Sequence, residues 1–432
     1  MTRNYWQAFF LIAILEFSVF LAGFWMLGDY EAKRFNVWPI SEWLINYQGG
    51  FVRRGLMGEI LRYFSDARGS IVLLNSLVLT FFYLYIVIFL AVYYFANIRQ
   101  IGLLIIALLI PGGILHMSVG AIFYPRKEIL FLIHFGILCL IYLMHDRFRV
   151  KKGRLSLDLF GITAVLGGGL LTLVHEAYLF MAYPITVLLF VNLHKANRTY
   201  YPLKLQLFFY VLLIPVLFGL CSAYRGDPQI AQRIWDSYTL IDRLVLAPAA
   251  PYTAAYATAG LGWTLQQHLS TIYGVFMTGT WIYWLFFAVA NAFVLVYIAI
   301  QIEKKQVIEQ GNSESNYFKN SPLPLQTIGA FIISSSMVMI ASDYGRWIAC
   351  ATNLTLLFLF TVSHSSGLLN FDLGRWKLGN RLIPIFNWAS GSVVLLILIL
   401  SYELIFQMPE CCISGGDLFM PYAKFLELYH SN

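Results

Sequence analysis

Four short polar segments interrupt an otherwise apolar sequence, and their residue types are those of a phosphate-binding or acid–base site. They are the arginine pair Arg53–Arg54 after a double glycine, the Tyr-Pro-Arg-Lys-Glu segment 124–128, the pair His175–Glu176, and the Ser-Asp-Tyr-Gly-Arg-Trp segment 342–347. Guanidinium groups hold phosphate through bidentate, charge-assisted hydrogen bonds. Ionisable side chains at membrane depth are costly unless they are paired or functional. The segments therefore predict a site for a phosphate-bearing ligand.

Each segment also allows a structural interpretation. The arginine pair can anchor a short amphipathic helix within 47–64 to anionic head groups. The cations of the second segment can pair with Glu128, and the Asp and Arg of the fourth, three residues apart, can form a local ion pair. The predicted phosphate- or substrate-binding residues are Arg53, Arg54, Glu59, Arg126, Lys127, His175, Glu176, Asp343 and Arg346.

A carboxylate that could act as a general base follows the first apolar run. Asp29 lies in the sequence Gly-Asp-Tyr-Glu, and Glu31 is its nearest alternative. A sugar transfer needs such a group to take the proton from the attacking hydroxyl. The competing interpretation of Asp29 is an ordinary acid at a helix end. We predict Asp29 as the catalytic residue.

The composition fixes the class of protein that holds these residues. Of 432 residues, 59% are hydrophobic and 12% are charged, which excludes a water-soluble enzyme. The apolar runs are continuous rather than alternating, as expected for spanning helices and not for a membrane barrel. The sequence predicts an all-α polytopic membrane protein with about eleven spans: 6–27, 71–95, 101–119, 128–145, 156–174, 177–193, 205–223, 279–301, 325–341, 347–363 and 384–403.

Basic residues indicate the orientation. More than half of the 29 Lys and Arg residues fall in loops that are cytoplasmic if the N-terminus is inside, which places the C-terminus outside. Residues 1–432 then form one integral membrane domain with two large outer loops, 28–70 and 224–278, both with interfacial helices, and a cytoplasmic linker, 302–324. All four polar segments are predicted at the outer face.

The sequence gives few signs of a cofactor. It contains no nucleotide-binding fingerprint, and its five cysteines lack metal-ligand spacing, so no metal site is predicted, although a divalent ion is compatible with the reaction. The net charge of +7 is attributed to membrane orientation rather than to nucleic-acid binding. The state of the adjacent pair Cys411–Cys412 is left open.

This arrangement resembles the GT-C superfamily of polytopic glycosyltransferases. Members have large outer loops, an acidic catalytic residue near the end of the first helix, and polyprenyl-phosphate sugar donors. The resemblance implies that Asp29 is the catalytic residue, with Glu31 nearby, and that Arg126 binds phosphate in a short outer turn. The Asp-Glu or Asp-x-Asp pattern of several members is replaced here by Asp29-Tyr30-Glu31.

The expected function is transfer of a sugar from a polyprenyl-phosphate-type donor to an extracytoplasmic glycan or lipid, in the inner membrane of a bacterium. The expected partners are the lipid bilayer, the donor and the acceptor, with no nucleic acid. One alternative is an O-antigen or capsule polymerase that uses diphosphate-linked oligosaccharides. An alternative of another class is a lipid-linked-sugar flippase or secondary transporter, which would place polar residues near the bilayer midplane at broken helices.

Overall fold

The computed structural model describes most of the chain between residues 37 and 408. The described residues are 37–65, 69–98, 100–114, 126–147, 149–197, 199–246, 257–262, 265–277, 279, 281–309, 323–339, 343–364, 388–389, 391–406 and 408. The predicted first span, 6–27, with Asp29 and Glu31, and the pair Cys411–Cys412 lie outside these residues.

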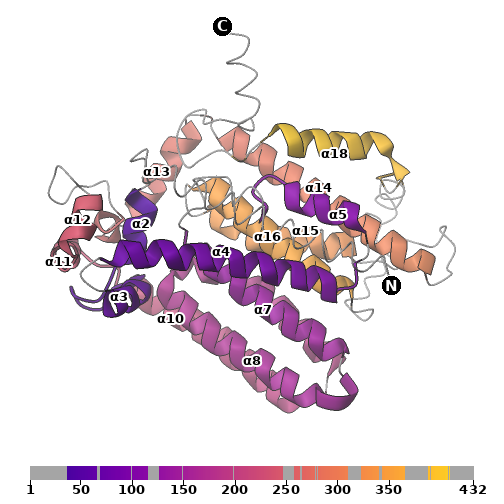
Figure 1. The fold of residues 1–432 in the computed structure, drawn as a ribbon, viewed down its shortest axis with the longest axis horizontal. Coiled ribbons are helices and arrows are strands. Elements are labelled where there is room, and N and C mark those ends of the chain that lie inside the picture. The colour runs from indigo at the N-terminus through magenta and orange to yellow at the C-terminus, as the bar shows by residue number, and fades with distance from the viewer. Residues whose placement is uncertain are drawn as a thin grey trace, which may run out of the picture.

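Long helices make up the body of the molecule, as the apolar runs predict (Figure 1). Those long and apolar enough to cross a membrane are α4 (Ser70–Phe95), α7 (Glu128–Arg147), α8 (Arg149–Val174), the η1–α9 unit (Glu176–Leu179 and Ala182–Ala196), α10 (Tyr201–Ala223), α14 (Trp281–Glu309) and α16 (Tyr344–Ser363). At 1.5 Å per residue, a helix of about 20 residues spans the roughly 30 Å hydrocarbon core. The chain is an all-helical polytopic membrane protein.

Three other predicted spans form shorter helices. They are α5 (Ile101–Leu109), α15 (Leu323–Ser334, continued by η4, Ser336–Met339) and α18 (Val393–Ile405). Proline and glycine at 111–113 end α5 early, because proline has no amide hydrogen to donate and Gly112 adopts a φ of 80°. The break expected at His175–Glu176 is confirmed, since α8 ends at Val174 and η1 begins at Glu176.

The connecting segments contain further short helices. The predicted first outer loop holds α2 (Val37–Leu44) and α3 (Gly55–Phe64), and the second holds α11 (Pro228–Asp236), α12 (Leu240–Leu246), η2 (Ala259–Gly262) and α13 (Leu265–Met277). Helix α14 continues to Glu309, so its last turns extend into the segment assigned to a linker.

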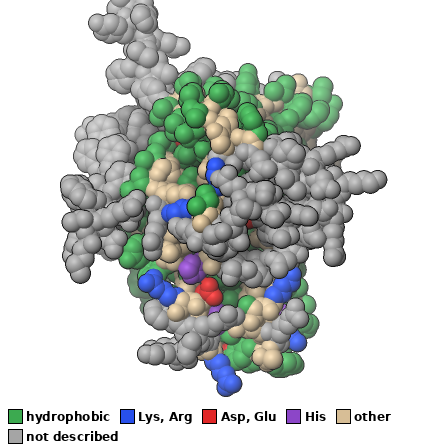
Figure 2. Space-filling view, turned by 90° about the vertical axis from the view of Figure 1, so that its right-hand side faces the viewer, with side chains coloured by type: hydrophobic (Ala, Val, Ile, Leu, Met, Phe, Trp, Pro, Cys, Tyr) green, Lys and Arg blue, Asp and Glu red, His purple; other side chains and the backbone are tan. Residues whose placement is uncertain are grey.

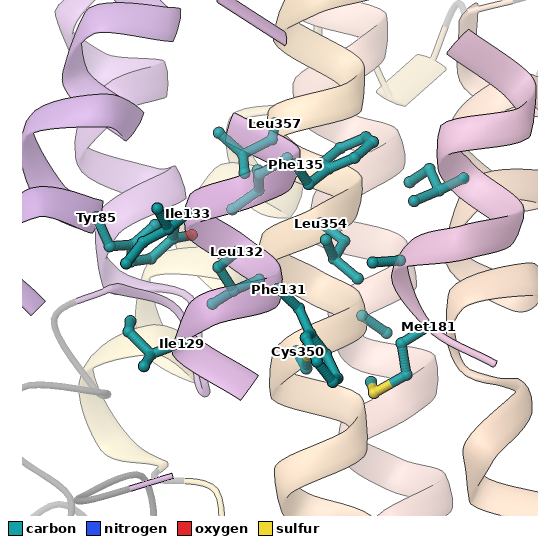
Figure 3. Packing of buried hydrophobic residues seen from close by; sticks show 14 of the residues in the cluster. Tyr85, Ile129, Phe131, Leu132, Ile133, Phe135, Met181, Cys350, Leu354 and Leu357 are labelled. Carbon is teal, nitrogen blue, oxygen red and sulfur yellow. The ribbon is translucent and has the colours of Figure 1, made fainter. Parts of the chain in front are cut away.

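Helix α16 lies at the centre of the bundle and is buried along its whole length. It packs against α4, α7, α9, α14 and α15. Figure 3 shows Phe131 and Phe135 of α7 directed toward α16, where Cys350, Leu354 and Leu357 lie. By contrast, α8 exposes an apolar stripe at spacings of three and four residues, which is the pattern of a lipid-facing helix surface: Leu155, Leu159, Ile162, Leu166 and Leu170.

Helices α7 and α16 run parallel, so the bundle has two distinguishable ends. At one end the Glu128 and Arg346 side chains lie 3.1 Å apart, and at the other Asp146 and His364 approach to 3.8 Å. Helices α2, α3 and α11 cover the first end, at the left of Figure 1. Figure 2 views the opposite end, where Lys and Arg side chains reach the surface.

Candidate functional site

Ten ionisable side chains converge at the end of the bundle that α2 and α3 cover. They comprise five cations, four carboxylates and one histidine, and we call them the charged cluster: Arg53, Arg54, Arg126, Lys127, Arg346, Glu42, Glu128, Glu176, Asp343 and His175. They come from α2, from the turn before α3, and from the residues that begin α7, η1 and α16. The structure thus brings together the four polar segments that the sequence separates by up to about 300 residues.

Arg54 makes the best-aligned contacts in the cluster. Its Nε donates to both Glu176 carboxylate oxygens at 3.0 and 2.9 Å, and its Nη2 donates to Glu176 Oε1 at 2.6 Å. Its Nη1 donates to Glu42 Oε1 at 2.7 Å. Such bidentate geometry uses the planar guanidinium fork and is not available to lysine.

The backbone around Arg54 is specialised to present this side chain. Arg54 has a φ of 66°, in the left-handed region that non-glycine residues rarely adopt. The next residue, Gly55, lies directly against the ring of Tyr47, so a side chain at position 55 would collide with it. The close packing and the hydrogen bonds of Arg54 hold this strained turn in place before α3 begins.

Glu42 is the centre of the cluster, although it is not among the binding residues predicted from the sequence. Its side chain is buried and approaches four basic groups: Arg54 at 2.7 Å, His175 at 3.3 Å, Arg346 at 3.8 Å and Arg126 at 3.9 Å. Burial raises the pKa of a carboxyl group, but Arg54, His175 and Arg346 together outweigh burial and hold the pKa of Glu42 well below its ordinary value. The available signal was a single acid in the apolar run Val-Trp-Pro-Ile-Ser-Glu-Trp-Leu.

Arg53 connects the cluster to the second large loop. Its Nη2 donates to the main-chain oxygens of Gly260 and Leu261, both at 3.2 Å, and its Nη1 lies 3.5 Å from Glu176. Its own backbone amide donates to the Tyr224 carbonyl at 2.9 Å. Arg53 therefore fixes the loop that contains η2 over the first loop.

Lys127 is fully buried beneath the arginine turn. Its ammonium group donates to the main-chain oxygens of Arg54 at 3.0 Å and Val174 at 3.3 Å. Burial lowers the pKa of Lys127 to about 8, although the nearby Glu42 favours its charged form. Lys127 thus ties the start of α7 to the end of α8 and to the turn before α3.

His175 has a defined hydrogen-bonding direction. Its Nδ1 accepts a hydrogen bond from the Ala177 amide at 3.1 Å, so in the neutral ring the proton lies on Nε2. That nitrogen faces Glu42 Oε1 at 3.3 Å and Glu128 Oε1 at 3.6 Å. His175 therefore directs this nitrogen toward both carboxylates.

The part of the cluster nearest α16 is less well satisfied. Arg346 lies 2.9 Å from Asp343, 3.1 Å from Glu128 and 4.1 Å above the Trp347 ring, and Arg126 approaches Asp343 at 3.6 Å. However, within the part of the chain that the structure describes, neither Glu128 oxygen accepts a hydrogen bond, and neither Nε nor Nη1 of Arg346 donates one. Buried polar groups are almost always hydrogen-bonded, so this half of the cluster has capacity for a polar ligand.

Glu59, also predicted as a binding residue, has different partners. It accepts hydrogen bonds from Arg62, from Gln48 and from the Tyr47 amide on the outer surface of α3. None of these partners belongs to the charged cluster. Among the described residues, no group of three or more His, Cys, Asp or Glu side chains could hold a metal ion.

Comparison with known proteins gives one partial match. Residues 10–201 match the family described as uncharacterised membrane protein Rv1490. The matched segment includes Glu42, both arginines of the turn, segment 126–128 and the pair His175–Glu176, but not Asp343 or Arg346. This likeness supports a membrane protein. No curated protein and no solved structure matches the chain.

Proposed function

We propose that this protein is a membrane glycosyltransferase of the GT-C type, which moves a sugar from a polyprenyl-phosphate donor to an extracytoplasmic glycan or lipid acceptor. The observation that carries the proposal is the charged cluster. Its five cations exceed its four carboxylates by one when His175 is neutral, which favours an anionic ligand. Removing so many charges from water is expensive and suggests a role beyond stability.

The poorly satisfied half of the cluster supports a phosphate in particular. Nε and Nη1 of Arg346 and Nε2 of His175 lie near carboxylates but make no hydrogen bond of good geometry within the described part of the chain. A phosphate has several acceptor oxygens and could engage such donors together with Arg126. The same groups would stabilise the negative charge that develops on a departing phosphate.

In the proposed reaction, the acceptor hydroxyl attacks the anomeric carbon of the donor sugar. Asp29, or Glu31 as the alternative, takes the hydroxyl proton. The bond between the anomeric carbon and the phosphate oxygen breaks, and its electron pair leaves with the polyprenyl phosphate. Arg126, Lys127 and Arg346 are the proposed stabilisers of that leaving group, while Glu42 holds the arginines in position.

The proposed location is the extracytoplasmic face of a bacterial inner membrane. The charged cluster lies at the opposite end of the bundle from the surface in Figure 2, on which separate Lys and Arg side chains are visible. Basic residues on short loops tend to remain cytoplasmic. The cluster then faces the side on which envelope glycans are assembled.

A transport function is the second candidate, because α5 breaks inside the bundle at Pro111–Gly113. Side-chain amides of Asn291 and Asn353 bind the carbonyls of Pro111 and Gly112 at 2.9 and 2.8 Å. Broken helices with polar residues at the midplane are typical of transporters. A polymerase that uses diphosphate-linked donors would share the charged cluster and differ in its donor.

The test is transfer by the full-length protein in vesicles. The probes are polyprenyl-monophosphate mannose, glucose and arabinose with a radiolabelled sugar, and one polyprenyl-diphosphate oligosaccharide. We expect protein-dependent release of the polyprenyl phosphate carrier from a monophosphate donor. Asp29→Asn should lower that rate by about 10²–10⁴-fold, because it removes a positioned base. A larger loss in Glu31→Gln would instead assign the base to Glu31.

The matched control is Asp146→Asn, which removes a carboxylate at the opposite end of the bundle and should leave the rate unchanged. Release only from the diphosphate donor would favour the polymerase. Movement of an intact lipid-linked sugar across the vesicle, without cleavage, would replace the transferase by a transporter.

A further inference from the structure

A polar network fills the middle of the bundle, away from the charged cluster. Asn291 donates to the Pro111 carbonyl and to Thr352 Oγ1 at 3.0 Å, and Asn353 donates to the Gly112 carbonyl. These asparagines lie near the midpoints of the spans 281–306 and 344–363. The network therefore surrounds the break in α5 at about half the thickness of the membrane.

The network uses both amide oxygens as well as the amide nitrogens. Tyr85 donates its hydroxyl to Asn353 Oδ1 at 2.9 Å, and Tyr402 donates to Asn291 Oδ1 at 2.8 Å. Tyr402 belongs to α18, so this hydrogen bond attaches α18 to α14. Met408, just beyond α18, packs against Gly112 in the broken segment.

Glu403 is adjacent to Tyr402 and, unlike every carboxylate of the charged cluster, has no basic partner among the described residues. Its side chain is 0% exposed, and neither carboxylate oxygen has a hydrogen-bond partner among the described residues. The salt bridges among the described residues do not include it. Glu42, equally buried, has four basic neighbours.

A carboxylate without donors cannot remain ionised in such a place, because transfer of an unpaired charge into an apolar interior is prohibitively costly. A metal cation would require several oxygen ligands. The amide oxygens nearest the break already accept hydrogen bonds from tyrosines. A proton is the cation that this site can hold.

We propose that Glu403 is an intramembrane proton-binding site, and that release of its proton is linked to separation of α18 from α5 and α14. In the packed arrangement the acid is neutral. Loss of the proton leaves a charge that only water or a new partner can stabilise, so α18 must move to supply one. Protonation and the docking of α18 are thus one equilibrium, independent of the proposed sugar transfer.

This linkage has a quantitative signature. If opening of α18 releases one proton, the opening equilibrium changes about tenfold for each unit of pH. The slope applies above about pH 5, where a solvated glutamate is ionised. Replacement by glutamine, which has the size of the neutral acid and no ionisation, should remove the slope.

The experiment is hydrogen exchange of the purified full-length protein at several pH values, corrected for the intrinsic rate. We expect protection of α18 to fall about tenfold per unit of pH in the wild type and to stay constant in Glu403→Gln. The helix α8 serves as the internal control, with no slope in either protein. A flat wild-type profile, or equal slopes in the two proteins, would overturn the proposal.

A second measurement uses dicyclohexylcarbodiimide, an apolar reagent that modifies protonated carboxyl groups. We expect mass spectrometry to find modification at Glu403 that slows as pH rises, with the partly exposed Glu59 unmodified. Absence of modification at Glu403 would contradict a neutral acid there. A Glu403→Gln chain that fails to fold would also contradict it, because the amide resembles the protonated acid in size and charge.

Discussion

The two ends of the α7–α16 pair carry similar charged groups in opposite surroundings. At one end Glu128 and Arg346 have side chains 4% and 9% exposed, within a cluster of ten ionisable groups. At the other, Asp146 and His364 are about 30% exposed and pair only at 3.8 Å. An exposed pair contributes about 0–1 kcal/mol, whereas breaking a buried one costs several times more. The energetic effect of an acid–base pair therefore depends on how much water surrounds it.

The largest effect should come from Glu42→Gln. The substitution leaves Arg54, Arg126 and Arg346 without their shared carboxylate, and we expect a loss of about 3–5 kcal/mol in the free energy of unfolding. The measurement is denaturant unfolding in detergent, with Asp146→Asn as the control at the other end, expected to change stability by less than about 0.5 kcal/mol. Equal effects at the two ends would remove the distinction between them.

Arg54→Lys should lower the free energy of unfolding by a smaller amount. An ammonium group cannot reproduce the bidentate contact with Glu176 and also reach Glu42. We expect about 1–3 kcal/mol in the same unfolding assay. Arg62→Lys is the matched control, since Arg62 is 43% exposed and contacts Glu59 on the surface. A double-mutant cycle with Glu176→Gln should show coupling for position 54 and none for position 62.

Because of Lys127, we expect the free energy of unfolding to depend on pH in a way that the exposed end of the bundle does not produce. Its pKa is about 8 in the folded protein and about 10.4 when the chain is unfolded, so the unfolded state binds more protons between these values. Stability should therefore rise with pH in that window, by up to about 1.4 kcal/mol per unit. Lys127→Met should remove this rise. The pH dependence of unfolding in both proteins is the measurement, and a rise retained in the methionine variant would assign it to another group.

The side of the membrane on which each end of the bundle lies can be tested by cysteine labelling. We expect Tyr63→Cys, exposed on α3, to react with an impermeant maleimide in intact cells. Lys195→Cys, at the last turn of α9, should react only after the membrane is opened. The reverse pattern would place the charged cluster in the cytoplasm and exclude an extracytoplasmic site.

Sequence reasoning predicted most of the helices, because a spanning segment must bury its backbone and expose apolar side chains to lipid wherever it lies. It also predicted the break at His175–Glu176 and the gathering of four polar segments. It missed Glu42, since one acid within an apolar helix has no periodic or motif signal. The sequence predicted Glu59 and Arg54 alike as binding residues. In the structure, the turn at Arg54 and Gly55 directs their two side chains to different neighbours.

The sequence by itself determined that this is a helical membrane protein, because length and apolarity of a segment are local properties that the bilayer selects. It also determined which residues are too polar to face lipid. Only the tertiary structure decided their partners: that Arg54 binds Glu176 and Glu42, that Lys127 binds main-chain oxygens, and that Glu403 has no donor among the described residues. Such pairing depends on distances between segments far apart in the chain, and in a low-dielectric interior those distances decide whether a charge is tolerated.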